Sequence, residues 1–188
     1  MKAWVSAAVL ALAFYSCSVS AKIDEQQYSF DYTALSEPSL RAITRDLKAE
    51  SYRFLWQRPD GSGWSFRLAV DPQGGGRVIA RRFITEAGQI KPEGQAKITE
   101  INNREVITFR AYLKIADFWR LNIEDEFAQA SGTVWVLEGV QQGNYRWLKR
   151  FAPKDMYFRD AGLYLIELAG LARADFLVVD RVTQLPTG

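Results

Sequence analysis

Carboxylates are the side chains that could do acid–base chemistry in this chain. Three of them, Glu124, Asp125 and Glu126, follow one another, and Asp117 lies a few residues earlier. Two carboxylates roughly 5–10 Å apart can hydrolyse a glycosidic bond without a histidine. A run of acids is, however, more often a solvated loop than a catalytic site. A carboxylate-dependent hydrolase acting on polysaccharide is therefore the alternative hypothesis for this chain, with Glu138, Glu124 and Asp125 as its catalytic groups.

Glu138 is the sharpest single candidate because it lies within an apolar strand expected at residues 134–140. Burial raises the pKa of a carboxyl group and can make it a general acid. An ion pair with Arg146 on the less buried face of a strand pair is the simpler interpretation, because opposite charges are favourable cross-strand neighbours. In the leading hypothesis, in which the protein acts by binding, we therefore expect no catalytic residue.

The chain has one cysteine, Cys17, and no histidine. If residues 1–21 are removed, the remainder has neither a thiol nor an imidazole. Disulfides within the chain and serine–histidine or cysteine–histidine mechanisms are then excluded. So are zinc and copper sites built from nitrogen and sulfur ligands. No calcium-loop pattern of spaced aspartates occurs either, and we expect no metal and no cofactor.

Residues 1–21 have the pattern of an export signal. Lys2 supplies a positive start, residues 5–15 are apolar, and small residues at Val19 and Ala21 suit a cleavage site before Lys22. The apolar run is shorter than the roughly 20 residues that span a membrane, and no second such run follows. We expect an exported protein, periplasmic or secreted. Lipid anchoring through Cys17 is the minor alternative, because the residues before it match a lipoprotein site poorly.

The charge of the chain argues against nucleic-acid binding. The formal net charge is +2, and Lys2 lies in the signal, which leaves the rest close to neutral. A dedicated nucleic-acid binder would show a strong basic bias.

Most of the tryptophans have the spacing of a buried sheet face, and an exposed aromatic patch would mark a partner site. The candidate binding residues are Trp135, Tyr145, Arg146 and Trp147.

The central element is a strand pair within residues 133–153. Residues 134–140 and 145–151 alternate as strands do, and a three-residue loop, residues 141–143, places a glycine where positive φ is needed. That loop pairs Val140 with Asn144, Gly139 with Tyr145 and Glu138 with Arg146. A two-residue turn at Gln142 and Gly143 is the competing possibility. We prefer the three-residue loop because it places a ring over a glycine and pairs opposite charges.

Other elements follow along the chain. A second hairpin spans residues 51–70, a strand spans residues 77–84, a loop spans residues 86–94, and another strand spans residues 95–101. Asn102 or Asn103 can cap a helix that continues to about Trp119, and Asp155 can cap a second helix. A short helix is expected near residues 38–47, and a further strand at residues 176–179.

Tight turns between consecutive strands require antiparallel neighbours. The sequence therefore predicts an α+β fold: an antiparallel sheet of about six strands with two main helices on one face. The expected organisation is a signal peptide at 1–21, an N-terminal arm with a possible short helix at 22–50, an α+β domain at 51–175, and a C-terminal tail at 176–188.

Three segments carry a resemblance: S-Y-R-F-L-W at residues 51–56, A-D-F-W at residues 116–119, and W-x-x-E-G-x-x-x-G-x-Y at residues 135–145, followed by Arg150 and Pro153. Together they resemble uncharacterised bacterial exported proteins with a hairpin of this pattern. Those proteins often have Tyr-His after the turn, where this chain has Tyr145-Arg146. The resemblance implies a fold and no activity.

These observations favour an exported bacterial protein that acts by binding in the periplasm or envelope. The expected partner is another protein or an envelope component, and no nucleic acid. Hydrolysis of envelope polysaccharide stays the alternative.

Overall fold

The computed structural model describes residues 30–121 and 132–177. The chain divides into residues 1–30 and residues 31–188, and the second unit contains every helix and strand described below. The expected signal, Cys17 and the acidic run at Glu124, Asp125 and Glu126 lie outside the described residues.

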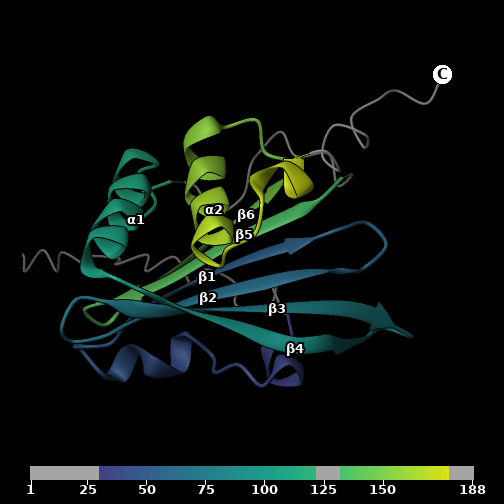
Figure 1. Cartoon of the computed structure of the whole chain (residues 1–188), viewed down its shortest axis with the longest axis horizontal. Helices are drawn as coiled ribbons and strands as arrows, with labels where there is room; N and C mark the ends of the chain where they lie inside the picture. Colours follow the sequence, from purple (N-terminus) through teal and green to yellow (C-terminus); the bar gives the residue numbers. More distant parts are fainter. Residues whose placement is uncertain (1–29, 122–131, 178–188) are drawn as a thin grey trace, which may run out of the picture. The chain divides into compact units, whose positions relative to one another are not determined.

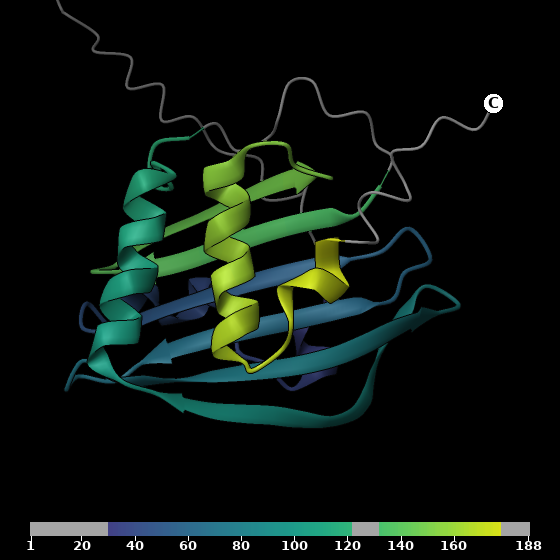
Figure 2. The ribbon, with the colours of Figure 1, turned by 45° about the horizontal axis from the view of Figure 1, so that its top comes forward.

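Six antiparallel strands form one sheet in the order β4-β3-β2-β1-β5-β6. They are β1 (Glu50–Gln57), β2 (Gly63–Val70), β3 (Gly76–Glu86), β4 (Gln89–Ile101), β5 (Val134–Gln141) and β6 (Asn144–Phe151). Two longer helices, α1 (Asn103–Ile115) and α2 (Met156–Leu168), lie side by side on one face (Figure 1 and Figure 2). The predicted α+β fold with six strands and two main helices is confirmed.

Both helices begin at the caps that the sequence predicts. The Asn102 side chain accepts a hydrogen bond from the N–H of Glu105, whose carboxylate accepts one from the N–H of Asn102. This reciprocal capping box satisfies two otherwise unpaired donors. Asp155 caps α2 in the simpler way, through the N–H of Tyr157. The apolar stripes of both helices are buried against Tyr52, Phe54, Trp56 and the other core residues of the sheet.

The predicted register of the β5–β6 hairpin is wrong. The structure has the two-residue turn, with Gln142 at φ 51° and Gly143 at φ 77°, so that Gln141 pairs with Asn144. Because side chains alternate between faces, a slip of one residue moves every side chain of β6 to the other face. Trp147 now lies beside Glu138, and Leu148 lies beside Leu137 in the core.

Residues of strand β1 take the place of the partners that were expected for Glu138 and Gly139 within the β5–β6 hairpin. Glu138 lies opposite Arg53 of β1, and Gly139 lies opposite Tyr52. The ring that covers the glycine and the cation that pairs with the glutamate therefore both come from β1. The predicted ion pair between Glu138 and Arg146 is absent from the described ion pairs, and Arg146 instead donates to the carbonyl oxygen of Leu121.

Two smaller predictions are also wrong. The loop expected at residues 86–94 is a two-residue turn at Ala87 and Gly88, and β3 and β4 continue as one long hairpin. Residues 173–177 are helical rather than extended, and Phe176 packs against Trp56, Trp64 and Phe66. The rest of the strand expected at residues 176–179 lies outside the described residues.

The second face of the sheet is covered as well. Two short 3₁₀ helices, η1 (Tyr32–Leu35) and η2 (Arg41–Arg45), pack there, opposite α1 and α2 (Figure 1). They bury Leu35 and Leu40 completely, and the interiors of β1 and β5 are buried on both faces. The short helix expected near residues 38–47 is the 3₁₀ helix η2. Among the helices of the described residues, none combines the length and apolar character needed to cross a bilayer.

Candidate functional site

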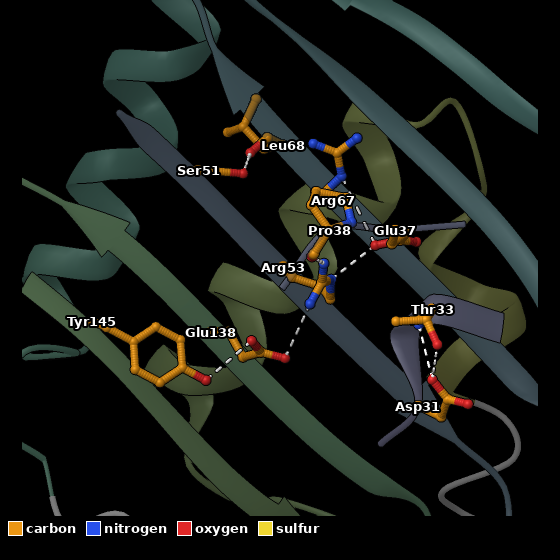
Figure 3. A network of polar contacts seen from close by, with 10 residues as sticks. All are labelled: Asp31, Thr33, Glu37, Pro38, Ser51, Arg53, Arg67, Leu68, Glu138 and Tyr145. Atoms are coloured by element: carbon orange, nitrogen blue, oxygen red, sulfur yellow. Dashed lines mark hydrogen bonds and ion pairs between the residues drawn. The ribbon is translucent and has the colours of Figure 1, made fainter. Parts of the chain in front are cut away.

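Charged residues of strands β1 and β5 form a buried network with the segment that comprises η1, η2 and the residues between them (Figure 3). We call this segment the N-terminal layer. Arg53 is fully buried, and its Nε lies 2.8 Å from Oε2 of Glu37. Its Nη1 lies 3.5 Å from Oε1 of Glu138, and its Nη2 donates to the carbonyl oxygen of Pro38. The hydroxyl of Tyr145 donates to Oε2 of Glu138 at 3.2 Å. We call Glu37, Arg53, Glu138 and Tyr145 the Arg53 network.

Burial governs the protonation of this network. It raises the pKa of Glu138 above its usual value, and the positive charge of Arg53 with the hydroxyls of Tyr32 and Tyr145 offsets only part of that rise. Burial alone would lower the pKa of Arg53, but Glu138, Tyr32 and Glu37 raise it. Burial and Glu138 also raise the pKa of Tyr145. Arg53 therefore stays charged, and Tyr145 stays a hydrogen-bond donor.

The Arg53 network holds the fold together and does not have the geometry of an active site. Glu138 is 3% exposed and lines neither of the two cavities described below. A general acid must reach the proton that it transfers, and Glu138 reaches Arg53 and Tyr145 instead. Burial raises the pKa of Glu138 in the direction expected of a general acid, but a substrate cannot reach this side chain.

The raised pKa of Glu138 gives a testable pH dependence. The native state holds the Glu138 proton at pH values where the unfolded chain, titrating near 4.5, has lost it, so this residue's contribution to stability falls as pH rises. We expect the stability of the wild type relative to Glu138→Gln to be highest near pH 4.5 and to decline as pH rises through the folded pKa. Urea unfolding midpoints of both proteins between pH 4.5 and 8 measure this difference. A difference that grows with pH would contradict it.

A second polar region surrounds Trp119, where α1 ends beside the β5–β6 turn. Two cavities of about 500 Å³ and 380 Å³ share Trp119 and Gln141 in their walls. We call them together the Trp119 groove. Its lining comprises Tyr52, Arg110, Leu113, Lys114, Asp117, Phe118, Trp119, Arg120, Gln141, Gln142, Asn144, Tyr145 and Arg146.

The end of α1 positions Trp119. After the last helical turn, Asp117 adopts a left-handed conformation with φ 47°. The N–H of Asp117 donates to the carbonyl of Lys114, and the N–H of Phe118 donates to that of Leu113. This is a Schellman motif, in which the residue after the left-handed one packs back on the helix. Phe118 is accordingly buried, and Trp119 is left half-buried at the surface.

The walls of the groove are fixed by packing and by one ion pair. Glu50 accepts hydrogen bonds from Nε and Nη2 of Arg110 at 2.7 and 2.6 Å, and one from the hydroxyl of Tyr52 at 2.9 Å. Gly139 lets the rings of Tyr52 and Phe118 approach β5 closely, because a Cβ there would lie 2.9 and 3.0 Å from them. The surroundings of Trp119 are therefore preformed.

The groove carries an excess of positive charge. Arg110 is neutralised by Glu50, which leaves Lys114, Arg120 and Arg146 against the carboxylate of Asp117. Lys114 and Arg120 are exposed and make no ion pair with any residue that the structure describes. Burial lowers the pKa of Arg146, and Asp117 opposes that change. The groove suits an anionic ligand better than a cationic one.

The structure separates the four candidate binding residues. Tyr145 and Arg146 line the groove. Trp135 is fully buried in the core, and Trp147 is buried on the face of the N-terminal layer, so neither side chain reaches the groove. Trp119 and Arg120, which also line the groove, are not among the four predicted binding residues. Their position directly after a helix end, where a chain reversal exposes side chains, is the signal that could have found them.

No described group of three or more histidine, cysteine, aspartate or glutamate side chains is arranged to hold a metal ion.

No model of a known protein family matches the chain, and no curated protein sequence matches it. The interpretation of the site therefore depends on its geometry.

Proposed function

We propose that this protein is a non-catalytic binding domain that takes its ligand in the Trp119 groove. The observation that carries the proposal is a partly exposed tryptophan set in a preformed hollow with cationic and amide side chains around it. Aromatic rings with a few placed polar groups are the usual composition of a ligand site. The ligand is a component of the cell envelope or a protein exposed there.

The hydrolase alternative has less support. It needs two carboxylates that face each other across one hollow, and Asp117 is the one carboxylate among the lining residues of the described cavities. Glu138 is buried in the Arg53 network. Glu124 and Asp125 lie outside the described residues, and a catalytic role for them stays a prediction.

The proposed location is outside the cytoplasm. The support is the sequence pattern of residues 1–21, in which a basic start, an apolar run and small residues precede Lys22. A ligand in the envelope fits that location. Lipid attachment at Cys17 would keep the same groove at a membrane surface.

The proposal is tested by retention of envelope material on the immobilised exported chain. We expect the wild type to retain a component that Trp119→Ala does not, because that change removes the central ring of the groove. Tyr157→Ala is the matched control: Tyr157 is 52% exposed on α2 and does not line the groove. This control should retain the component as well as the wild type does.

Two results would overturn the proposal. Equal retention by wild type and Trp119→Ala, with both folded, would place the binding surface elsewhere. Release of new reducing ends from envelope polysaccharide, lost in Glu138→Gln or Asp125→Asn, would make the protein a hydrolase.

A further inference from the structure

We infer that the Trp119 groove binds a carboxylated polysaccharide, a chain of sugar rings that carry uronate groups. This inference rests on the proposed function and names the ligand class for the same groove. Three properties of the lining carry it: the indole of Trp119, several amide side chains, and cationic side chains that make no ion pair with the residues the structure describes.

The aromatic ring suits a sugar. One face of a pyranose ring carries mainly C–H groups, which pack against the flat face of an indole and remove apolar surface from water. Trp119 lies in the wall shared by both cavities, so a chain that crosses from one to the other passes it. Volumes of about 500 and 380 Å³ leave room for consecutive sugar units rather than a single small ion.

The amides suit hydroxyl groups. Gln141, Gln142 and Asn144 line the hollow at the β5–β6 turn. Each amide offers two donors and one acceptor, which matches hydroxyls that both donate and accept. A ligand held by charge alone, such as a phosphate ion or a run of acidic side chains, would leave these groups unused.

The cations specify the acidic substituent. A guanidinium presents a planar fork that pairs with both oxygens of a carboxylate. Arg120 is exposed and makes no ion pair with the described residues. Arg146 donates one hydrogen bond, from Nη2, to the carbonyl oxygen of Leu121. Arg146 Nε is buried and makes no hydrogen bond to the described part of the chain. Lys114 adds a third positive charge in the larger cavity, which Arg120 also lines.

The probe is a tetramer of galacturonic acid, and the matched comparison is the same tetramer with its carboxylates methyl-esterified. Binding of each to the exported chain is followed by tryptophan fluorescence or calorimetry at low and moderate salt. We expect the acidic tetramer to bind at least about tenfold more tightly than the ester, because the ester keeps the rings and loses the charges. Salt should weaken the acidic tetramer more than the ester.

Variants locate the binding. We expect Trp119→Ala to lower the affinity about tenfold or more, and Arg120→Gln to lower it about fivefold. Arg104→Gln removes the same charge at the exposed start of α1, outside the groove, and should leave the affinity unchanged. Asp117→Asn keeps a side chain that tolerates the left-handed conformation and removes the opposing charge, so it should raise the affinity.

Three outcomes would overturn the inference. Equal affinity for the acidic tetramer and its ester would remove the role of charge. A polyglutamate of equal charge that binds as tightly, with the same loss in Trp119→Ala, would make the ligand an acidic peptide. If no tetramer binds while Trp119-dependent retention of envelope material persists, the ligand class is wrong and the proposed function stands. Arg120→Gln, an exposed substitution, keeps the test valid if Trp119→Ala fails to fold.

Discussion

Replacing Arg53 with methionine is expected to lower the free energy of unfolding by about 3–5 kcal/mol. The substitution removes the cation shared by Glu37 and Glu138, and both carboxylates are 3% exposed. It also removes the donor to the carbonyl oxygen of Pro38. Each of these acceptors would then be buried with a partner missing, which costs more than the pair itself contributes. Urea or thermal unfolding measures the loss.

Two further variants separate the charge effect from lost packing. Arg67→Met removes the neighbouring arginine, which is 18% exposed and lies 3.9 Å from Glu37, and should cost less than about 1 kcal/mol. Adding Glu37→Gln and Glu138→Gln to Arg53→Met should recover part of the stability, because the orphaned charges are gone. A loss below 1 kcal/mol for Arg53→Met would show that water reaches the network and solvates it.

Replacing Trp135 with alanine is expected to lower the free energy of unfolding by about 3–5 kcal/mol. Trp135 is fully buried, its ring centroid lies 5.1 Å from that of Phe54, and its Nε1 donates to Thr133. The variant would leave a large cavity in the main core and would remove the hydrogen bond to Thr133. Chemical denaturation with near-ultraviolet circular dichroism reports both the stability and the loss of ordered aromatic packing.

The matched comparison for Trp135→Ala is Trp119→Ala. Because Trp119 is half-buried and belongs to the groove, its removal should cost clearly less stability while it removes binding. Trp135→Phe should lie between the wild type and Trp135→Ala, since it keeps a ring in the core. If Trp119→Ala were the more destabilising of the two, the assignment of one tryptophan to the scaffold and the other to the ligand would be wrong.

Local signals in the sequence were sufficient for the helices and for the hairpin of residues 51–70. Asn102 and Asp155 have the side chains that cap helices, and the hairpin expected at residues 51–70 is the β1–β2 pair of the structure. The turns of two hairpins were predicted wrongly for the same reason. Two-residue turns with both residues at positive φ are usually marked by Asn-Gly or Asp-Gly, whereas this chain uses Gln142-Gly143 and Ala87-Gly88.

The remaining features of the fold and the site depend on contacts between residues that are distant in the sequence. Arg53 and Tyr52 satisfy Glu138 and Gly139, and no pattern within residues 133–153 contains that information. The same holds for the N-terminal layer, because the sequence predicts a short helix there but does not indicate that Leu35 and Leu40 are buried beneath the sheet. The Trp119 groove was equally hidden: its lining comes from four separate elements and the segment after α1.

The Arg53 network also constrains the order in which the molecule assembles. Glu37 and Glu138 are held by one guanidinium although about a hundred residues separate them along the chain. The platform beneath η1 and η2 needs both β1 and β5, so the segment that is synthesised early has nothing to dock on until most of the protein has been made. Contacts of such long separation slow folding. Until that docking occurs, the face of the sheet that carries Arg53 and Glu138 is exposed to solvent.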